Sequence, residues 1–238
     1  MTNLEKVILL KKMFDDGQIP RLAQHEVNPG LSKDDRINYI YFTLPVSINF
    51  QRNSPAMWKS ALATYNDPET NYLFYPERVV EMSREKVQED LGKHRLGLQK
   101  NKHTDIWIAL SKTLNQYYEN NPANILKAGD NDVEKILKLI LENKKQFPFL
   151  SGLKISNYWL YILTNFTDAV FKNMHLISVI PDTHVIKSSI LLNLVDEKAT
   201  PIQVVEAWQE LLKDSEISPV EMHPVLWNWS RAGFKPEV

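Results

Sequence analysis

The chain contains no cysteine and only seven glycines among its 238 residues. The absence of cysteine excludes disulfide bonds, catalysis by a thiol, zinc–thiolate sites and iron–sulfur clusters held by cysteine. A cysteine-free chain suits a reducing compartment, so we expect a cytoplasmic protein. The scarcity of glycine argues against an all-β architecture, whose many tight turns need it. The N-terminal segment 1–17 carries acidic residues and no small-residue cleavage site, so we interpret it as a mature helix and not as a signal peptide.

An excess of charge of either sign and long apolar runs are also missing. Lysine and arginine total 28 against 29 aspartate and glutamate residues, which leaves a net charge of −1. A generic nucleic-acid binder is usually basic, so this balance counts against tight generic binding but permits a local basic face. No run of about 18 apolar residues occurs, so we expect no transmembrane helix. The six histidines are not at metal-ligand spacing with carboxylates, and we expect neither a metal nor a cofactor.

Apolar residues at helical spacing dominate what is present. Hydrophobic residues make up 43% of the chain, and most recur three and four positions apart, as on the buried face of a helix. Short connections between these segments favour an all-α, or mainly α, fold. The segment 37–50 is ambiguous, because its aromatic and β-branched residues suit either a strand or a buried helix interrupted at Pro45. Helices are expected at 4–14, 54–65, 106–118, 133–143, 155–170, 184–194 and 202–212.

The most informative stretch is 147–193. Gly152 precedes an expected helix, and Lys154 falls in the first turn of that helix. A neutral lysine amine is a nucleophile that can form a Schiff base with a sugar carbon. Asp182 directly precedes the next expected helix, where its carboxylate can cap free backbone N–H groups or stabilise an oxocarbenium-like centre on a sugar. Together the two residues point to amine chemistry at a sugar, whereas each motif alone is typical of an ordinary helix start.

This stretch resembles the helix-hairpin-helix DNA glycosylase superfamily, whose hairpin often reads Leu-Pro-Gly-Val-Gly-x-Lys. Gly152 takes the second glycine of that pattern, and Lys154 takes the catalytic lysine of the bifunctional members. Asp182 takes the invariant aspartate of the Val-Asp-x-His segment. His184 takes the histidine that follows, and Lys187 takes a commonly basic position. The resemblance implies catalytic roles for Lys154 and Asp182, and contacts to DNA for Ser151, Gly152, His184 and Lys187.

The chain departs from the family pattern in several places. Leu150 stands at the first glycine, Phe149 at the proline, and Pro181 where valine is usual. The loop from the hairpin to the aspartate is longer than in most members. These departures and the missing cysteines make the chain more similar to archaeal-type 8-oxoguanine glycosylase-lyases than to the endonucleases that carry an iron–sulfur cluster.

The resemblance also implies an architecture and a partner. It implies a two-lobed fold, with a helix-hairpin-helix lobe at approximately 76–195 and a second lobe formed by 1–75 and 196–238. The expected partner is double-stranded DNA that bears a lesion, bound by a monomer with no membrane association. The implied activity is cleavage of the N-glycosidic bond of a damaged purine such as 8-oxoguanine, with or without AP-lyase activity.

Two other functions remain open at this stage. An N-glycosidase on the same fold can act on a nucleoside, a nucleotide or RNA, which the near-neutral charge suits. A non-catalytic DNA- or protein-binding module is the alternative from a different class.

Three further residues are candidates for a base pocket or a wedge that enters DNA. Gln51 and Trp58 follow an aromatic stretch, and Trp227 belongs to an aromatic C-terminal segment. A flipped base is commonly read by stacking and hydrogen bonds from such side chains. The simpler interpretations are a core tryptophan at Trp58 and a C-terminus docked onto the body at Trp227. Two basic stretches, 93–95 and 100–103, either meet phosphates or form solvated loops.

Overall fold

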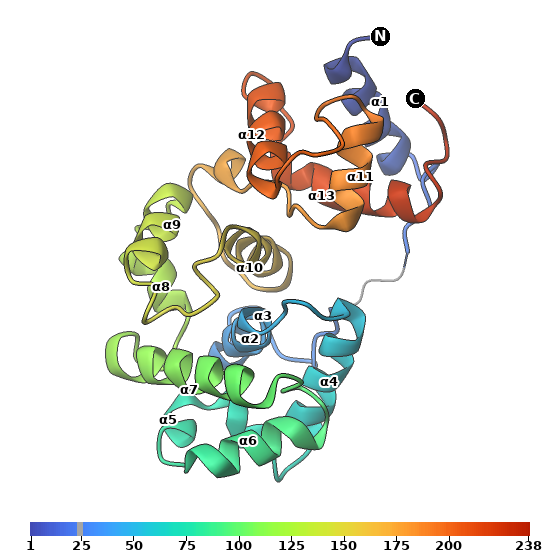
Figure 1. Cartoon of the computed structure of the whole chain (residues 1–238). Helices are drawn as coiled ribbons and strands as arrows, with labels where there is room; N and C mark the ends of the chain where they lie inside the picture. The colour runs from blue at the N-terminus through green and yellow to red at the C-terminus, as the bar shows by residue number, and fades with distance from the viewer. Residues whose placement is uncertain (23–25) are drawn as a thin grey trace. The chain divides into compact units, whose positions relative to one another are not determined.

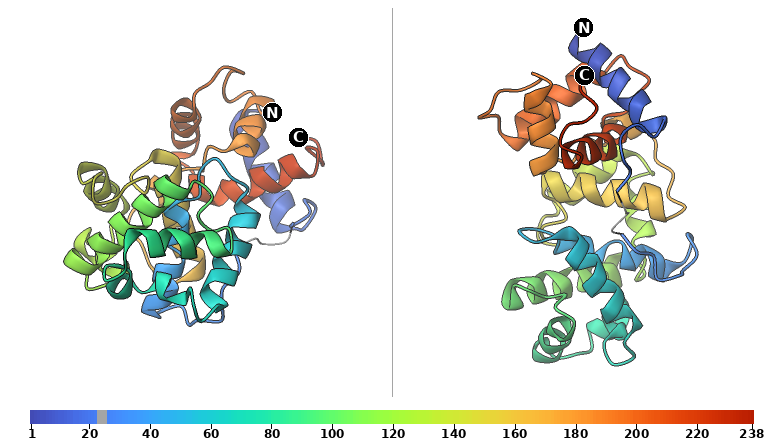
Figure 2. Two further views of the ribbon diagram at one scale, coloured as in Figure 1. Left: turned by 60° about the horizontal axis from the view of Figure 1, so that its bottom comes forward. Right: turned by 90° about the vertical axis from the view of Figure 1, so that its right-hand side faces the viewer.

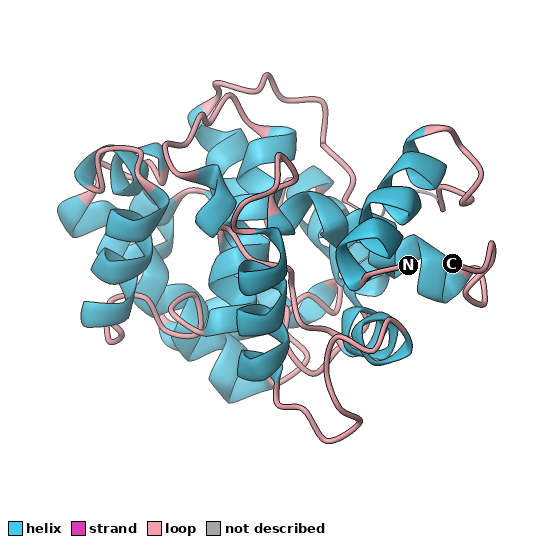
Figure 3. Cartoon of the chain, turned by 90° about the horizontal axis from the view of Figure 1, so that it is seen from above, coloured by secondary structure: helices cyan, strands magenta, loops and turns pink. Residues whose placement is uncertain are grey.

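The computed structural model describes residues 1–22 and 26–238 as a mainly helical chain (Figure 1). Within those residues no extended strand forms, and Figure 3 shows only helices and loops there. One isolated parallel bridge joins Asp132 to Lys172. The expectation of an all-α or mainly α fold is therefore confirmed.

The chain divides into two compact units. The terminal unit comprises Met1–Ala23 and Asn173–Val238, and the central unit comprises Gln24–Lys172. These boundaries do not coincide with the expected lobes, 76–195 against 1–75 plus 196–238. Residues 36–74 belong with the helices that follow them, because α3 (Leu44–Ser47) contacts α7 (Lys100–Tyr117) and η1 (Asn71–Phe74) contacts α5 (Pro76–Val79). Residues 183–191 belong with the C-terminus because they form α11 (Thr183–Leu191), which packs against α13 (Pro219–Arg231).

Several helices of the central unit begin at a side-chain cap or at a proline. Asp132 caps α9 through its side chain, as expected, and proline opens α3, α4 and α5. The elements of this unit are α2 (Arg36–Tyr41), α3 (Leu44–Ser47), α4 (Ser54–Asn66), η1 (Asn71–Phe74), α5 (Pro76–Val79), α6 (Arg84–Lys93), α7 (Lys100–Tyr117), α8 (Ala123–Ala128), α9 (Val133–Glu142) and α10 (Leu153–Phe166).

The ambiguous segment 37–50 is helical. It forms α2 and α3, so the interpretation as a buried helix interrupted near Pro45 is confirmed and the strand alternative is wrong. Pro45 lies in the first turn of α3, where its missing N–H costs no helical hydrogen bond. The aromatic residues that suggested a strand lie in the core instead, where Tyr41 and Phe42 are fully buried.

Aromatic side chains fill the core of the central unit. The Tyr41 ring lies 5.8 Å from Trp58 and 5.5 Å from Phe74, and Phe74 lies 5.7 Å from Trp107. The indole N–H of Trp107 donates to the carbonyl of Leu73 at 3.0 Å. Aromatic pairs at such spacing contribute about 0.5–1.5 kcal/mol each beyond their buried area. Within the same unit, α10 contacts α3, and the N–H of Trp159 on α10 donates to Thr43 Oγ1 at 2.9 Å.

The terminal unit brings both ends of the chain into one helical cluster (Figure 2). Its core includes Trp208, whose N–H donates to Ser189 Oγ at 2.8 Å, and Trp229, whose N–H donates to the Pro236 carbonyl at 2.8 Å. The expected docking of the aromatic C-terminus is confirmed for Trp229, which is 1% exposed. The elements are α1 (Asn3–Asp15), η2 (Met174–Leu176), α11 (Thr183–Leu191), α12 (Pro201–Leu212) and α13 (Pro219–Arg231).

Candidate active site

Residues 147–152 before α10, which the resemblance predicted to be the hairpin, form a tight turn whose left-handed residue is Phe149. Phe149 has φ +61°, whereas Gly152 has φ −76° and ψ 138°. The residue in the left-handed region is therefore Phe149 and not the glycine of this turn. A side chain at 152 would nevertheless be crowded, because a Cβ there would lie 3.2 Å from the Phe149 carbonyl oxygen. The amide N–H of Gly152 donates to that same oxygen at 3.0 Å.

Lys154 lies in the first turn of α10, as expected. Gly152 is the N-cap of α10 and provides no side-chain cap for the first amide groups. A shallow hollow opens at this helix start, lined by Ser151, Gly152, Lys154 and their neighbours. The Lys154 side chain is exposed and forms no ion pair with any carboxylate of the described residues. The amine is therefore not committed to a structural partner.

Asp182 is the N-cap of α11, which confirms its expected local role. Its Oδ1 accepts the backbone N–H groups of His184 and Val185, both at 2.9 Å. Both bonds go to Oδ1, so Oδ2 makes neither of them. Asp182 is half-buried, and a carboxylate in this setting is held in one orientation by the backbone.

The structure surrounds His184 with residues of α13. Its Nδ1 lies 3.1 Å from Ser230 Oγ, and its ring lies 5.6 Å from the Trp227 ring. The Arg231 guanidinium sits over Trp227 at 5.0 Å. Burial lowers the pKa of His184, and the Arg231 and Lys187 charges lower it further while Asp182 acts in the opposite direction. His184 is therefore neutral at pH 7.

The predicted residues thus fall into two groups. Asp182, His184, Lys187 and Trp227 are brought together in the terminal unit, and Ser151, Gly152 and Lys154 are neighbours in the central unit. Ser230 and Arg231 also belong to the first group, but the sequence analysis did not identify them because it assigned no helix over 219–231. They follow Trp227 by three and four residues, a helical spacing that could have indicated them.

The other two candidates for a base pocket, Gln51 and Trp58, belong to neither group. Gln51 is exposed in a left-handed conformation and accepts a long hydrogen bond from Gln99 at 3.4 Å. Trp58 is fully buried, with its ring 5.4 Å from Phe42. A wedge role would require Trp58 to leave this packing. The core interpretation of Trp58 therefore describes the structure, and Trp227 is the half-exposed tryptophan of the three candidates.

A buried polar network that the sequence did not reveal lies on the same helix as Lys154. Tyr158 accepts the N–H of Trp58 at 2.9 Å and donates to Glu26 Oε1 at 2.8 Å. Burial, followed by the charge of Glu26, raises the pKa of Tyr158, so the phenol stays protonated. Tyr158 follows Lys154 by four residues, a spacing that places both on one face of α10.

The described part of the chain shows neither a metal-binding cluster nor a membrane-spanning helix. There, no group of three or more histidine, aspartate or glutamate side chains is placed to hold a metal ion. None of the helices described is long and apolar enough to cross a membrane. Neither a scan against protein-family models nor a search of curated proteins found a match to this chain.

Proposed function

We propose that this chain is a base-excision DNA glycosylase that cleaves the N-glycosidic bond of a damaged purine, such as 8-oxoguanine. The observation that carries the proposal is the placement of Lys154 at the start of α10, directly after the hairpin. Its amine is exposed and free of carboxylate partners among the described residues. A lysine in a structural ion pair would not be available for attack on a sugar carbon.

In the proposed reaction, the neutral Lys154 amine attacks C1′ of the damaged nucleotide. The glycosidic C–N bond breaks, and its electron pair leaves with the base, which takes up a proton. The attacking nitrogen loses two protons, which balance the one taken up by the base and the one taken up by O4′ as the C1′–O4′ bond breaks and the sugar ring opens, so that a Schiff base forms between Nζ and C1′. Cleavage of the DNA strand by β-elimination from this Schiff base is the associated lyase step.

Asp182 is the proposed electrostatic partner in this reaction. Positive charge develops on the sugar as the base departs, and a preorganised carboxylate stabilises it. Its Oδ1 is held by two backbone N–H groups, so Oδ2 is the oxygen proposed to face the charge. A neutral His184 does not cancel the negative charge of Asp182. Ser151, Gly152, His184 and Lys187 are the proposed contacts to the DNA backbone.

Borohydride trapping on a duplex that carries 8-oxoguanine tests the proposal. Wild-type protein should form a reduced covalent adduct with the DNA, and Lys154→Gln should form none while remaining folded. Lys138→Gln is the matched control, because Lys138 is an exposed lysine of the same unit on α9. Adduct formation by Lys154→Gln at the wild-type level would remove Lys154 from the mechanism.

The alternatives give different outcomes in companion assays. Release of free base from nucleosides, nucleotides or RNA, with no trapping on the duplex, would favour an N-glycosidase for those substrates. Binding of duplex DNA without any base release would favour a non-catalytic module. Chromatography of the released bases separates these outcomes.

A further inference from the structure

Two phenylalanines from distant segments stack at the surface of the central unit. The rings of Phe50 and Phe149 lie 4.2 Å apart with an interplanar angle of 13°. Phe149 is 37% exposed, although a large apolar ring at a hairpin tip gains little from solvent contact. The left-handed backbone of Phe149 holds the ring in this position.

Lys102 is held over this stack by the rings rather than by a carboxylate. Its Nζ lies 4.7 Å from the Phe50 ring centre and 4.5 Å from that of Phe149. The ring quadrupoles attract the ammonium electrostatically. Lys102 forms no ion pair with a described carboxylate, so its charge is positioned but not neutralised.

Arg52 adds a second fixed cation beside the stack. Its guanidinium donates to the carbonyl oxygens of Leu96 at 2.6 Å and Arg95 at 3.3 Å. Burial lowers the pKa of Arg52 to about 10, which leaves it charged at pH 7. Burial lowers the pKa of His103 to about 4, and the charges of Arg52 and Lys102 contribute to that shift. We call this group the aromatic–cationic platform; it consists of Phe50, Arg52, Lys102 and Phe149.

The platform lies where three segments without any acidic residue meet. The segments 47–58, 94–104 and 143–166 contain no aspartate or glutamate, although the whole chain has 29. None of their lysines and arginines forms an ion pair with a carboxylate in the described ranges 1–22 and 26–238. The cations that these segments carry are Arg52, Arg95, Lys100, Lys102, Lys144, Lys145 and Lys154.

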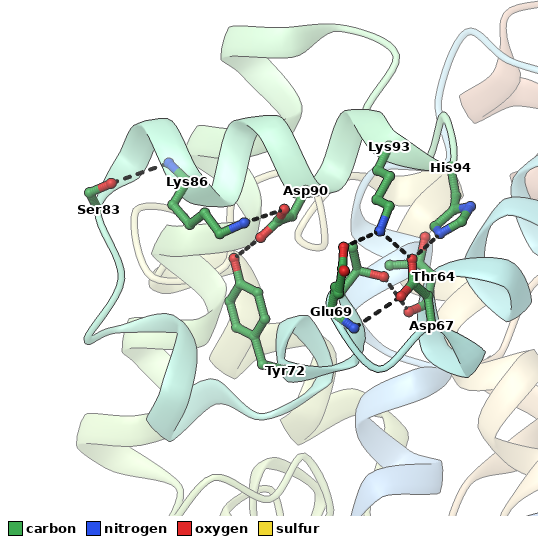
Figure 4. Close-up of polar contacts among 10 residues, drawn as sticks. Thr64, Asp67, Glu69, Tyr72, Ser83, Lys86, Asp90, Lys93 and His94 are labelled. Atoms are coloured by element: carbon green, nitrogen blue, oxygen red, sulfur yellow. Dashed lines mark hydrogen bonds and ion pairs between the residues drawn. The ribbon is translucent and has the colours of Figure 1, made fainter.

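On α6, by contrast, the lysines are paired with carboxylates (Figure 4). Lys93 forms ion pairs with Asp67 at 2.8 Å and Glu69 at 2.6 Å, and Lys86 pairs with Asp90 at 2.8 Å. In the first basic stretch, 93–95, the charge of Lys93 is therefore neutralised by two carboxylates. The second stretch, 100–103, retains its charge. In a chain of net charge −1, the platform region is a concentrated positive surface.

We propose that the aromatic–cationic platform binds the phosphodiester backbone of duplex DNA beside the hairpin. The proposal rests on the proposed function in naming DNA as the partner. Fixed cations without counter-ions match a regularly charged polyanion, and neutralising them releases counterions from DNA. Two helices, α7 and α10, begin in these segments without a side-chain cap, and backbone N–H groups at such ends also contact phosphates in DNA complexes. An acidic peptide offers less regular charge, and it enters the test as a competitor.

Binding of full-length protein to an undamaged, fluorescently labelled duplex tests the platform by anisotropy over a series of salt concentrations. Lys102→Gln should raise Kd about 3- to 10-fold and reduce the slope of log K against log salt by roughly 0.9, the effect of one phosphate contact. Phe50→Leu should raise Kd less, because it removes the ring under Lys102 but keeps the charge. Lys138→Gln is the control with the same change in charge.

Equal Kd values and salt slopes for Lys102→Gln and Lys138→Gln would overturn the platform. Displacement of the duplex by poly-glutamate at matched charge concentration would overturn DNA as its partner. Failure of the proposed function is distinguishable, because it removes borohydride trapping in the wild type without affecting the difference between the two variants. Trapping by the wild type together with equal binding of the variants would leave the glycosylase proposal standing and reject the platform.

Discussion

Trp58 donates its indole N–H to the phenol oxygen of Tyr158 at 2.9 Å, deep in the central unit. Tyr158 donates in turn to Glu26, so one phenol joins a buried tryptophan to a carboxylate. This network lies one helical turn after Lys154 on α10. It fixes the helix face from which the proposed nucleophile extends.

Removal of the Tyr158 hydroxyl should destabilise the fold. We expect Tyr158→Phe to lower the free energy of unfolding by about 1–3 kcal/mol, because the buried Trp58 N–H and the Glu26 carboxylate lose a partner. Urea denaturation followed by tryptophan fluorescence measures this change. Tyr117→Phe is the control, since Tyr117 is 62% exposed on α7. Equal stability of the two variants would contradict the importance of the network.

Substitution of Asp182 separates its catalytic role from its capping role. Asp182→Asn should reduce turnover about 100-fold, the scale of losing a preorganised electrostatic group. Its stability should change little, because asparagine caps helices nearly as well as aspartate. Asp182→Ala should lose the helix cap as well as the activity, which lowers the free energy of unfolding by about 0.5–2 kcal/mol. A large loss of stability in Asp182→Asn, with activity per folded molecule retained, would show that Asp182 is only a cap.

A double variant tests whether Lys154 and Asp182 act in one reaction. If they do, the rate loss of Lys154→Gln combined with Asp182→Asn should be much smaller than the product of the single losses, because residues that act as a unit are non-additive. Single-turnover base release measures the three variants. Additive losses would indicate independent roles.

Acid should weaken the polar cluster at the end of α6. Hydrogen bonds from Lys93 and His94 hold the pKa of Asp67 well below its ordinary value. A carboxyl with a depressed pKa stabilises the fold above its unfolded pKa, and this contribution is lost as pH falls toward the folded value. Asp67→Asn should therefore lower the urea midpoint at pH 7, and the difference from wild type should shrink below about pH 4. A difference that is constant with pH would contradict this assignment.

Buried His103 should produce a second, separate pH dependence. Its pKa is lowered from 6.5 to about 4, chiefly by burial. The unfolded chain therefore binds a proton between these values that the folded chain does not, so stability falls as pH decreases from 6.5 to 4 and not further below. His103→Gln should flatten the dependence of unfolding free energy on pH within that window. The slope is the readout, so a general loss of stability in the variant does not obscure it. An unchanged slope would exclude His103 as its source.

Local sequence determined most of the helices. Apolar spacing predicted α4, α9, α10 and α12 within a few residues, because a helix buries one face at a fixed period. The N-caps at Asp132 and Asp182 followed from chemistry within one turn of the chain. The placement of Lys154 in the first turn of α10 was predictable for the same reason.

Tertiary structure alone decided the relationships between distant segments. No local pattern distinguishes a buried strand from a buried helix at 37–50, and packing in the core selected the helix. Trp58 met Tyr158, and Ser230 met His184, through contacts that span many residues of sequence. The left-handed turn falls at Phe149 rather than at a glycine, and the ring of Phe149 stacks on Phe50, a residue far away in sequence. Periodicity and capping are local properties, whereas burial and cross-chain contacts depend on how the helices pack.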